Sequence, residues 1–86
     1  MYEVIFSDRA AIYYEKLPSN LQKRINKAID SLEENPFTGA QIKKLTGKLE
    51  GLYRYRIGNL RIVYQVFKPE SRVAVIEIGT RGDVYK

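Results

Sequence analysis

Residues 53–67 read YRYRIGNLRIVYQVF, and this stretch decides how the rest of the chain folds around it. Two β-rich runs are separated by a Gly-Asn dipeptide, which favours the tight two-residue turn of a β-hairpin. Because strand side chains alternate between the two faces of a sheet, Tyr53 and Tyr55 are expected to face the core. Arg54 and Arg56 then share the other face, with α-carbons roughly 6.5–7 Å apart. The stretch predicts a hairpin with one apolar and one basic face.

The segments before and after this hairpin predict two helices and two further strands. Residues 2–6 (YEVIF) favour a strand, Ser7 is suited to cap a helix over about residues 8–16, and a second helix is expected between Pro18 and Pro36. Residues 37–48 contain two glycines and no clean period, so they predict a loop with at most one short turn. Residues 72–78 (RVAVIEI) are nearly all apolar and predict a central strand. The second helix carries one stripe with the spacing of a buried helix face: Leu21, Ile25, Ala28, Ile29 and Leu32.

This order of elements predicts a single α+β domain over residues 1–86, with the arrangement β-α-α-β-β-β. Two N-terminal helices are expected to pack on one face of a mostly antiparallel, twisted sheet. The other face stays partly open, and ligand contact is expected there. A chain of 86 residues has one small core, so a surface groove is a more plausible site than a deep pocket.

The composition excludes several kinds of chemistry. The chain has no cysteine and no histidine, so we expect no disulfide, no structural zinc site and no histidine acid or base. No apolar run approaches the roughly 18 residues of a membrane span, and the first ten residues lack the apolar core of a signal peptide. We therefore expect a cytoplasmic protein with no membrane partner. The net charge of +5 favours a polyanionic partner, or merely solubility.

The positive charge is concentrated in and before the hairpin, where Glu50 is the single acid between residues 42 and 61. The basic residues there are Lys43, Lys44, Lys48, Arg54, Arg56 and Arg61. One interpretation is an edge hairpin that is kept from aggregating by its charges, although lysine is the usual residue for that purpose. Arginine binds phosphate in bidentate fashion, and interleaved tyrosines can stack on unpaired bases. We therefore favour phosphate binding over a purely protective role.

With these features in place, nearly the whole chain resembles the RelE/ParE superfamily of bacterial and archaeal type II toxins. The matching segments run in order through YEVIF, LEENP, KKLTG, GLYRYRIGNLRIVYQV, VAVIEIG and TRGDVYK. The hairpin pattern YRxRxGxxRxxY, followed by an arginine and a near-terminal tyrosine, is the most specific part of the resemblance.

The resemblance implies an mRNA endonuclease of the RelE branch, which cuts message in the ribosomal A site without a cofactor and is neutralised by a co-expressed antitoxin. The catalytic positions implied by the family are Arg54, Arg56, Arg61, Arg81 and Tyr85, and Lys43, Lys44 and Lys48 are candidate RNA-binding residues. Two alternatives stay open. One is a gyrase inhibitor of the ParE branch, and the other is a catalytically weak nucleic-acid-binding relative.

The chain departs from the family pattern at several of these positions. Well-studied members carry lysines where this chain has Arg54 and Arg56, and arginine is a poor general base because it is always protonated. The residue before Arg81 is often histidine in relatives and is Thr80 here. These departures favour phosphate binding by the arginines and leave the general base unassigned.

Overall fold

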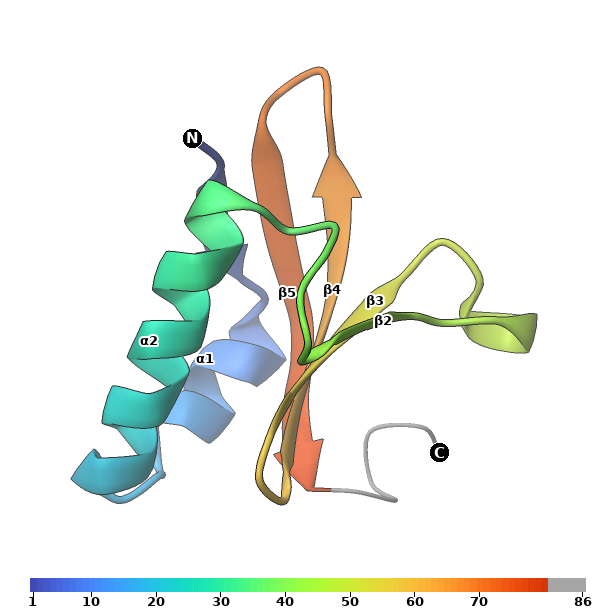
Figure 1. Cartoon of the computed structure of the whole chain (residues 1–86). Coiled ribbons are helices and arrows are strands. Elements are labelled where there is room, and N and C mark those ends of the chain that lie inside the picture. Colours follow the sequence, from blue (N-terminus) through green and yellow to red (C-terminus); the bar gives the residue numbers. More distant parts are fainter. Residues whose placement is uncertain (81–86) are drawn as a thin grey trace.

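The computed structural model describes residues 1–80 and shows two helices against one face of a five-stranded sheet (Figure 1). This arrangement confirms the predicted α+β fold. The elements, in chain order, are β1 (Glu3–Phe6), α1 (Asp8–Glu15), α2 (Ser19–Glu34), β2 (Ile42–Lys44), the 3₁₀ turn η1 (Gly47–Leu49), β3 (Tyr53–Ile57), β4 (Leu60–Phe67) and β5 (Arg72–Thr80).

Both helices begin and end close to the predicted residues. The Ser7 hydroxyl oxygen caps α1 by accepting a hydrogen bond from the backbone N–H of Ala10 at 3.1 Å. The predicted stripe of α2 points at the sheet, with Ile25, Ala28 and Leu32 buried. Within residues 1–80, neither helix has the length and apolar character needed to cross a membrane.

The strand order in the sheet is β1-β5-β4-β3-β2. β1 runs parallel to β5, and the other neighbouring pairs are antiparallel. The strand predicted over residues 72–78 is β5, which lies inside the sheet between β1 and β4 as predicted, although β4 is the middle one of the five strands. The reason is that one more strand than predicted extends the sheet on the far side of β3.

That extra strand is β2, which lies inside the segment predicted to be a loop. It pairs antiparallel with β3, so that Ile42 lies opposite Tyr55. Ile42 packs against the core, but its two neighbours in the strand are exposed lysines. A three-residue strand with a single apolar side chain shows no alternation of apolar and polar residues in the sequence. The strand conformation of β2 is instead stabilised by its pairing with β3. Because β2 covers β3, the hairpin is not at the edge of the sheet as the protective interpretation required.

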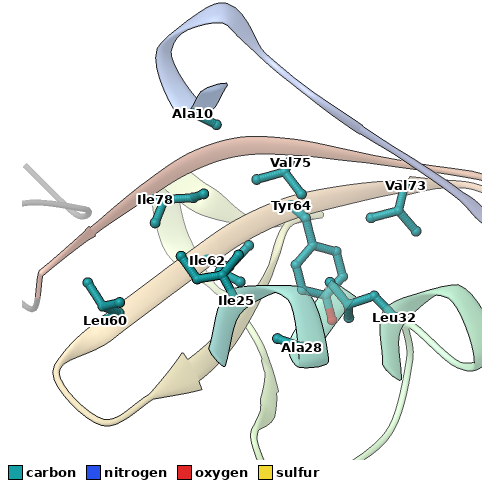
Figure 2. Packing of buried hydrophobic residues seen from close by; sticks show 10 residues of the cluster. All are labelled: Ala10, Ile25, Ala28, Leu32, Leu60, Ile62, Tyr64, Val73, Val75 and Ile78. Atoms are coloured by element: carbon teal, nitrogen blue, oxygen red, sulfur yellow. The ribbon is translucent and has the colours of Figure 1, made fainter. Parts of the chain in front are cut away.

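The core lies between α2 and the middle of the sheet, with Ala10 of α1 contributing from above β5 (Figure 2). Tyr64 is fully buried at its centre, and its hydroxyl donates a 2.8 Å hydrogen bond to the carbonyl oxygen of Pro36. Its ring stacks on that of Tyr53, with centroids 5.5 Å apart. Burial raises the pKa of the Tyr64 phenol above 10.0, and Tyr53 and Tyr55 add to the rise.

We expect Tyr64→Phe to destabilise the fold by ~1–3 kcal/mol at neutral pH, because it leaves the buried carbonyl of Pro36 without its donor. The raised pKa means that the folded chain favours the neutral phenol. The stability that Tyr64 contributes is therefore complete below pH 10.0 and falls as the pH rises above it.

Urea denaturation at several pH values tests both parts of this expectation. Above about pH 10, the unfolding free energy of the wild-type protein should fall with pH more steeply than that of Tyr64→Phe. The two slopes should differ by up to ~1.4 kcal/mol per pH unit. Equal slopes for the two proteins would contradict the assignment of this titration to Tyr64.

Candidate nucleic-acid interface

Three arginines lie together on the sheet face that is turned away from the helices, which we call the arginine face. The register pairs Arg56 of β3 directly with Arg61 of β4, and it places Arg54 two residues along the same face. Tyr53 and Tyr55 point the other way and pack against the core. The predicted division of the hairpin into a basic and an apolar face is confirmed.

The three arginine side chains differ in how firmly they are held. Arg61 is 8% exposed, so its guanidinium is held among neighbouring groups. Arg54 is half-buried, and its Nη1 donates a 3.2 Å hydrogen bond to the carbonyl oxygen of Gln41. Arg56 is exposed and can reach outward. The face therefore combines a nearly buried cation, Arg61, with an exposed one, Arg56, directly opposite.

A polar hollow of about 360 Å³ opens where β3 turns into β4, and no carboxylate from residues 1–80 lines it. The lining residues are Gln41, Arg56, Gly58, Asn59 and Arg61. Gly58 adopts a φ of 55°, the left-handed conformation that the tight turn requires. Two cations with amide groups beside them and no acid make a site suited to an anion.

The three predicted lysines are not equivalent in the structure. Lys43 lies opposite Arg54 in the β2–β3 register and so belongs to the arginine face. Lys44 lies opposite Tyr53 and points to the other face. Lys48 is in η1, outside the sheet, and is exposed. Of the three, the structure brings only Lys43 to the arginines.

Sequence reasoning missed two residues at this site, Arg24 and Gln41. Arg24 is on α2, away from the buried stripe, and a charged residue at such a position usually belongs to a solvated helix face. In the structure it lines a hollow of about 230 Å³ together with Gln41 and Arg56. No signal in the sequence links α2 to the hairpin turn, because only the packing of the helix on the sheet brings them together.

Two of the predicted catalytic residues, Arg81 and Tyr85, lie outside the described residues. The last described strand, β5, ends at Thr80, and its Gly79 lies directly opposite Arg61. Within residues 1–80 no three acidic side chains gather in a way that could hold a metal ion.

A larger, mostly apolar hollow of about 490 Å³ lies elsewhere, between α1 and the end of β5. It is lined in part by Ile12, which is 54% exposed, and by Arg9 and Glu77. Those two side chains form an ion pair of 3.0 Å, so the acid is neutralised. The hollow offers an apolar contact surface with no group suited to catalysis.

The fold and the arginine face together define a small α+β protein with a candidate anion site on its sheet. Comparisons with known proteins assign it to a family. Residues 4–85 match the model of the ParE toxin of the type II toxin–antitoxin system parDE. A curated protein of Methanocaldococcus jannaschii, named "Putative toxin RelE1", is 37% identical over 71 residues, which cover 80% of this chain and 77% of that protein.

Solved structures show the same likeness. One is a chain of the E. coli RelBE toxin–antitoxin complex, with 29% identity, a TM-score of 0.80 and coverage of 93% of this chain and 96% of that chain. Another is from the archaeal RelE–RelB complex of Pyrococcus horikoshii, with 27% identity, a TM-score of 0.81 and coverage of 94% and 96%. The chain belongs to the RelE/ParE superfamily of type II toxins, as the resemblance implied.

Proposed function

We propose that this toxin is a ribosome-dependent endoribonuclease that cleaves mRNA in the A site and so stops translation. The observation that carries the proposal is the pair Arg56 and Arg61, which lie opposite each other on one sheet face and line a hollow to which the described residues contribute no carboxylate. That arrangement suits a phosphodiester, since guanidinium groups bind its oxygens in bidentate fashion. The proposed place of action is the cytoplasm.

The proposed chemistry uses the 2′-hydroxyl of the RNA as nucleophile, so the protein needs neither a metal ion nor another cofactor. Arg61 and Arg81 hold the scissile phosphate and stabilise the charge that develops on it. The 2′-hydroxyl loses its proton to water, and its oxygen attacks phosphorus. The bond to the 5′-oxygen breaks, and that oxygen takes up a proton for which Arg81 is the candidate donor; Arg81 then regains a proton from water. The products are a 2′,3′-cyclic phosphate and a 5′-hydroxyl.

The other predicted residues position the substrate. Arg54 and Arg56 hold the flanking backbone and lower the pKa of the 2′-hydroxyl electrostatically. Tyr85 stacks on or orients a base. Gly79 lies opposite Arg61, and the sequence reaches Arg81 two residues later, which supports a role for both arginines at one phosphate.

The proposed site has no residue suited to act as general base, and dependence on the ribosome is expected for that reason. An arginine does not take up the 2′-proton at neutral pH, so positioning must supply most of the acceleration. A ribosome that presents message in a fixed, strained geometry provides that positioning. Free RNA is therefore expected to be cut slowly.

Primer extension tests this proposal in two ways. In cells, it maps mRNA ends after brief induction of the toxin. With purified toxin, it compares the cutting of free mRNA with the cutting of mRNA on programmed ribosomes. We expect cuts at A-site codons on ribosomes and little cutting of free RNA. Efficient cutting of free RNA would contradict the proposal. So would an Arg81→Ala protein that cuts normally on ribosomes.

A second candidate function is inhibition of DNA gyrase, because the family model that matches this chain is that of the ParE toxin of parDE. A DNA-damage response on induction, without new mRNA ends, would support this function instead. A third possibility is a binding protein without catalysis, which would cause no growth arrest that depends on Arg81 or Tyr85.

We further propose that a co-expressed antitoxin neutralises the chain, since the similar RelE structures come from toxin–antitoxin complexes. An acidic, amphipathic segment would suit both the arginine face and the apolar hollow beside Ile12. The test is co-purification of the tagged toxin with the product of a small neighbouring reading frame. Loss of growth arrest on co-expression is the expected result, and undiminished arrest with no complex would contradict the pairing.

A further inference from the structure

The guanidinium group of Arg24 on α2 lies beside the turn between β3 and β4. A Cβ atom placed on Gly58 would lie 3.2 Å from the Nη2 atom of Arg24 and 3.8 Å from its Cζ atom. The guanidinium group therefore rests on the one residue of the turn that has no side chain. In Figure 1 the start of α2 and this turn lie at the same end of the molecule.

The hollow beside Arg24 continues into the hollow of the arginine face. Gln41, Arg56 and Gly58 line both of them; one reaches Arg61 and the other reaches Arg24. They join at the edge of β3, just before β2 begins at Ile42. There the N–H of Arg56 and the Nη1 atom of Arg54 both donate to the carbonyl oxygen of Gln41, at 3.0 and 3.2 Å. A continuous surface thus leads from the arginine face, around the edge of the sheet, to α2.

Among residues 1–80, the charged side chains along this surface are all cations, and no aspartate or glutamate lines either hollow. Within the described part of the chain, Arg24 and Arg56 form neither an ion pair nor a side-chain hydrogen bond, unlike Arg9 and Arg72, which pair with acids. Two guanidinium groups beside one hollow repel each other, and a bound anion between them relieves that repulsion.

We propose that Arg24 and Arg56 together bind a phosphate of the RNA backbone, so that the RNA strand passes around the hairpin turn from the arginine face to α2. The inference rests on the proposed function for the identity of the ligand as RNA. Arg24 is a positioning residue here, since it holds the strand outside the proposed cleavage point. The phosphate can belong to the message or to ribosomal RNA, and the experiment separates the two sources.

The first test is binding of a short single-stranded RNA, methylated at its 2′-oxygens to prevent cleavage, followed by fluorescence anisotropy at several salt concentrations. Arg24→Gln should weaken binding about tenfold at low salt. It should also lower the slope of log K against log salt by ~0.7, the value for one phosphate contact on a single strand. Lys27→Gln is the matched control, because Lys27 is an exposed cation on α2 that lines neither hollow. It should change neither quantity.

A double-mutant cycle with Gly58→Ala tests the position of the guanidinium rather than its charge. The added methyl group lies 3.2 Å from the Arg24 guanidinium and forces it to shift, so Gly58→Ala should weaken RNA binding in the wild-type background. It also strains the turn, because Gly58 has a φ of 55°, but that strain acts equally in both backgrounds and cancels in the cycle. In the Arg24→Gln background the same change should have a much smaller effect, since the group that it displaces is gone. Equal effects in both backgrounds would contradict a role for the seated guanidinium.

The second test measures binding of the same variants to vacant ribosomes that carry no message. Weaker binding of Arg24→Gln to the RNA strand alone assigns the phosphate to the message, and weaker binding to vacant ribosomes assigns it to ribosomal RNA. Unchanged binding to both overturns the inference. Primer extension with the wild-type protein tests the proposed ribonuclease function separately. If the protein binds RNA through Arg24 but cuts no mRNA, the proposed cleavage is wrong and the phosphate contact of Arg24 stands.

Discussion

Replacing Arg61 with glutamine should lower the rate of mRNA cleavage on programmed ribosomes by about 10²–10³-fold, the loss typical of a donor that stabilises charge in a transition state. Arg61 is the one arginine of the face that is nearly buried, and it lies directly opposite Arg56. A cation held in that way is already in place when charge develops on the phosphate. Single-turnover rates from primer extension give the measurement.

Two further variants make the result specific. Arg72→Gln is the control, because Arg72 is an exposed arginine paired with Glu3 at 3.6 Å, and it should cut at the wild-type rate. Arg61→Lys keeps the charge but loses the planar fork, so its rate should fall between those of wild type and Arg61→Gln. Thermal unfolding of each protein shows that the comparison is made on folded chains. A rate for Arg61→Gln within about threefold of wild type, well short of that loss, would contradict the proposed role.

The same variant separates the two toxin branches. If Arg61→Gln abolishes mRNA cleavage and growth arrest together, the arrest depends on the arginine face, as the proposed ribonuclease requires. If growth arrest persists without any new mRNA ends, the chain acts on another target, and the gyrase alternative gains support. Arg61 is therefore the most informative position among the described residues.

The hairpin could be predicted from sequence because its information is local. A Gly-Asn turn fixes the register, and the register alone places Arg56 opposite Arg61. The alternation of tyrosine and arginine then determines which face is buried. The helices were predictable for the same reason, since the cap at Ser7 and the apolar stripe of α2 are patterns of residues close together in the sequence.

The remaining features depend on contacts between distant segments. β2 forms only because β3 offers it a partner edge, and its lysines give no sign of a strand. The position of Arg24 depends on how α2 crosses the sheet, which no local pattern specifies. Such packing turns a residue of an apparently solvated helix face into part of the candidate site. This is also why Lys44, which is next to Lys43 in sequence, does not join the arginines.

The largest effect on stability is expected from Ile25→Ala, which should lower the unfolding free energy by ~2–5 kcal/mol. Ile25 is 0% exposed and belongs, with Ile62 of β4, to the buried cluster between α2 and the sheet (Figure 2). The change removes buried methyl groups and leaves a cavity that the rigid sheet cannot fill. For a chain of this length, such a loss is a large share of a total stability of roughly 4–13 kcal/mol.

Urea denaturation measures this loss as a lower midpoint with an unchanged slope. Ile12→Ala provides the matched control, since it makes the same chemical change on α1 at a residue that is 54% exposed. It should alter stability by less than ~0.5 kcal/mol, because alanine favours the helix and little apolar surface is lost. Similar losses for both variants would contradict the placement of the core between α2 and the sheet. Ile25 is buried, whereas Arg24, beside it in α2, is exposed. Folded Ile25→Ala protein should therefore still bind RNA, which separates the structural role of this helix turn from the proposed phosphate contact.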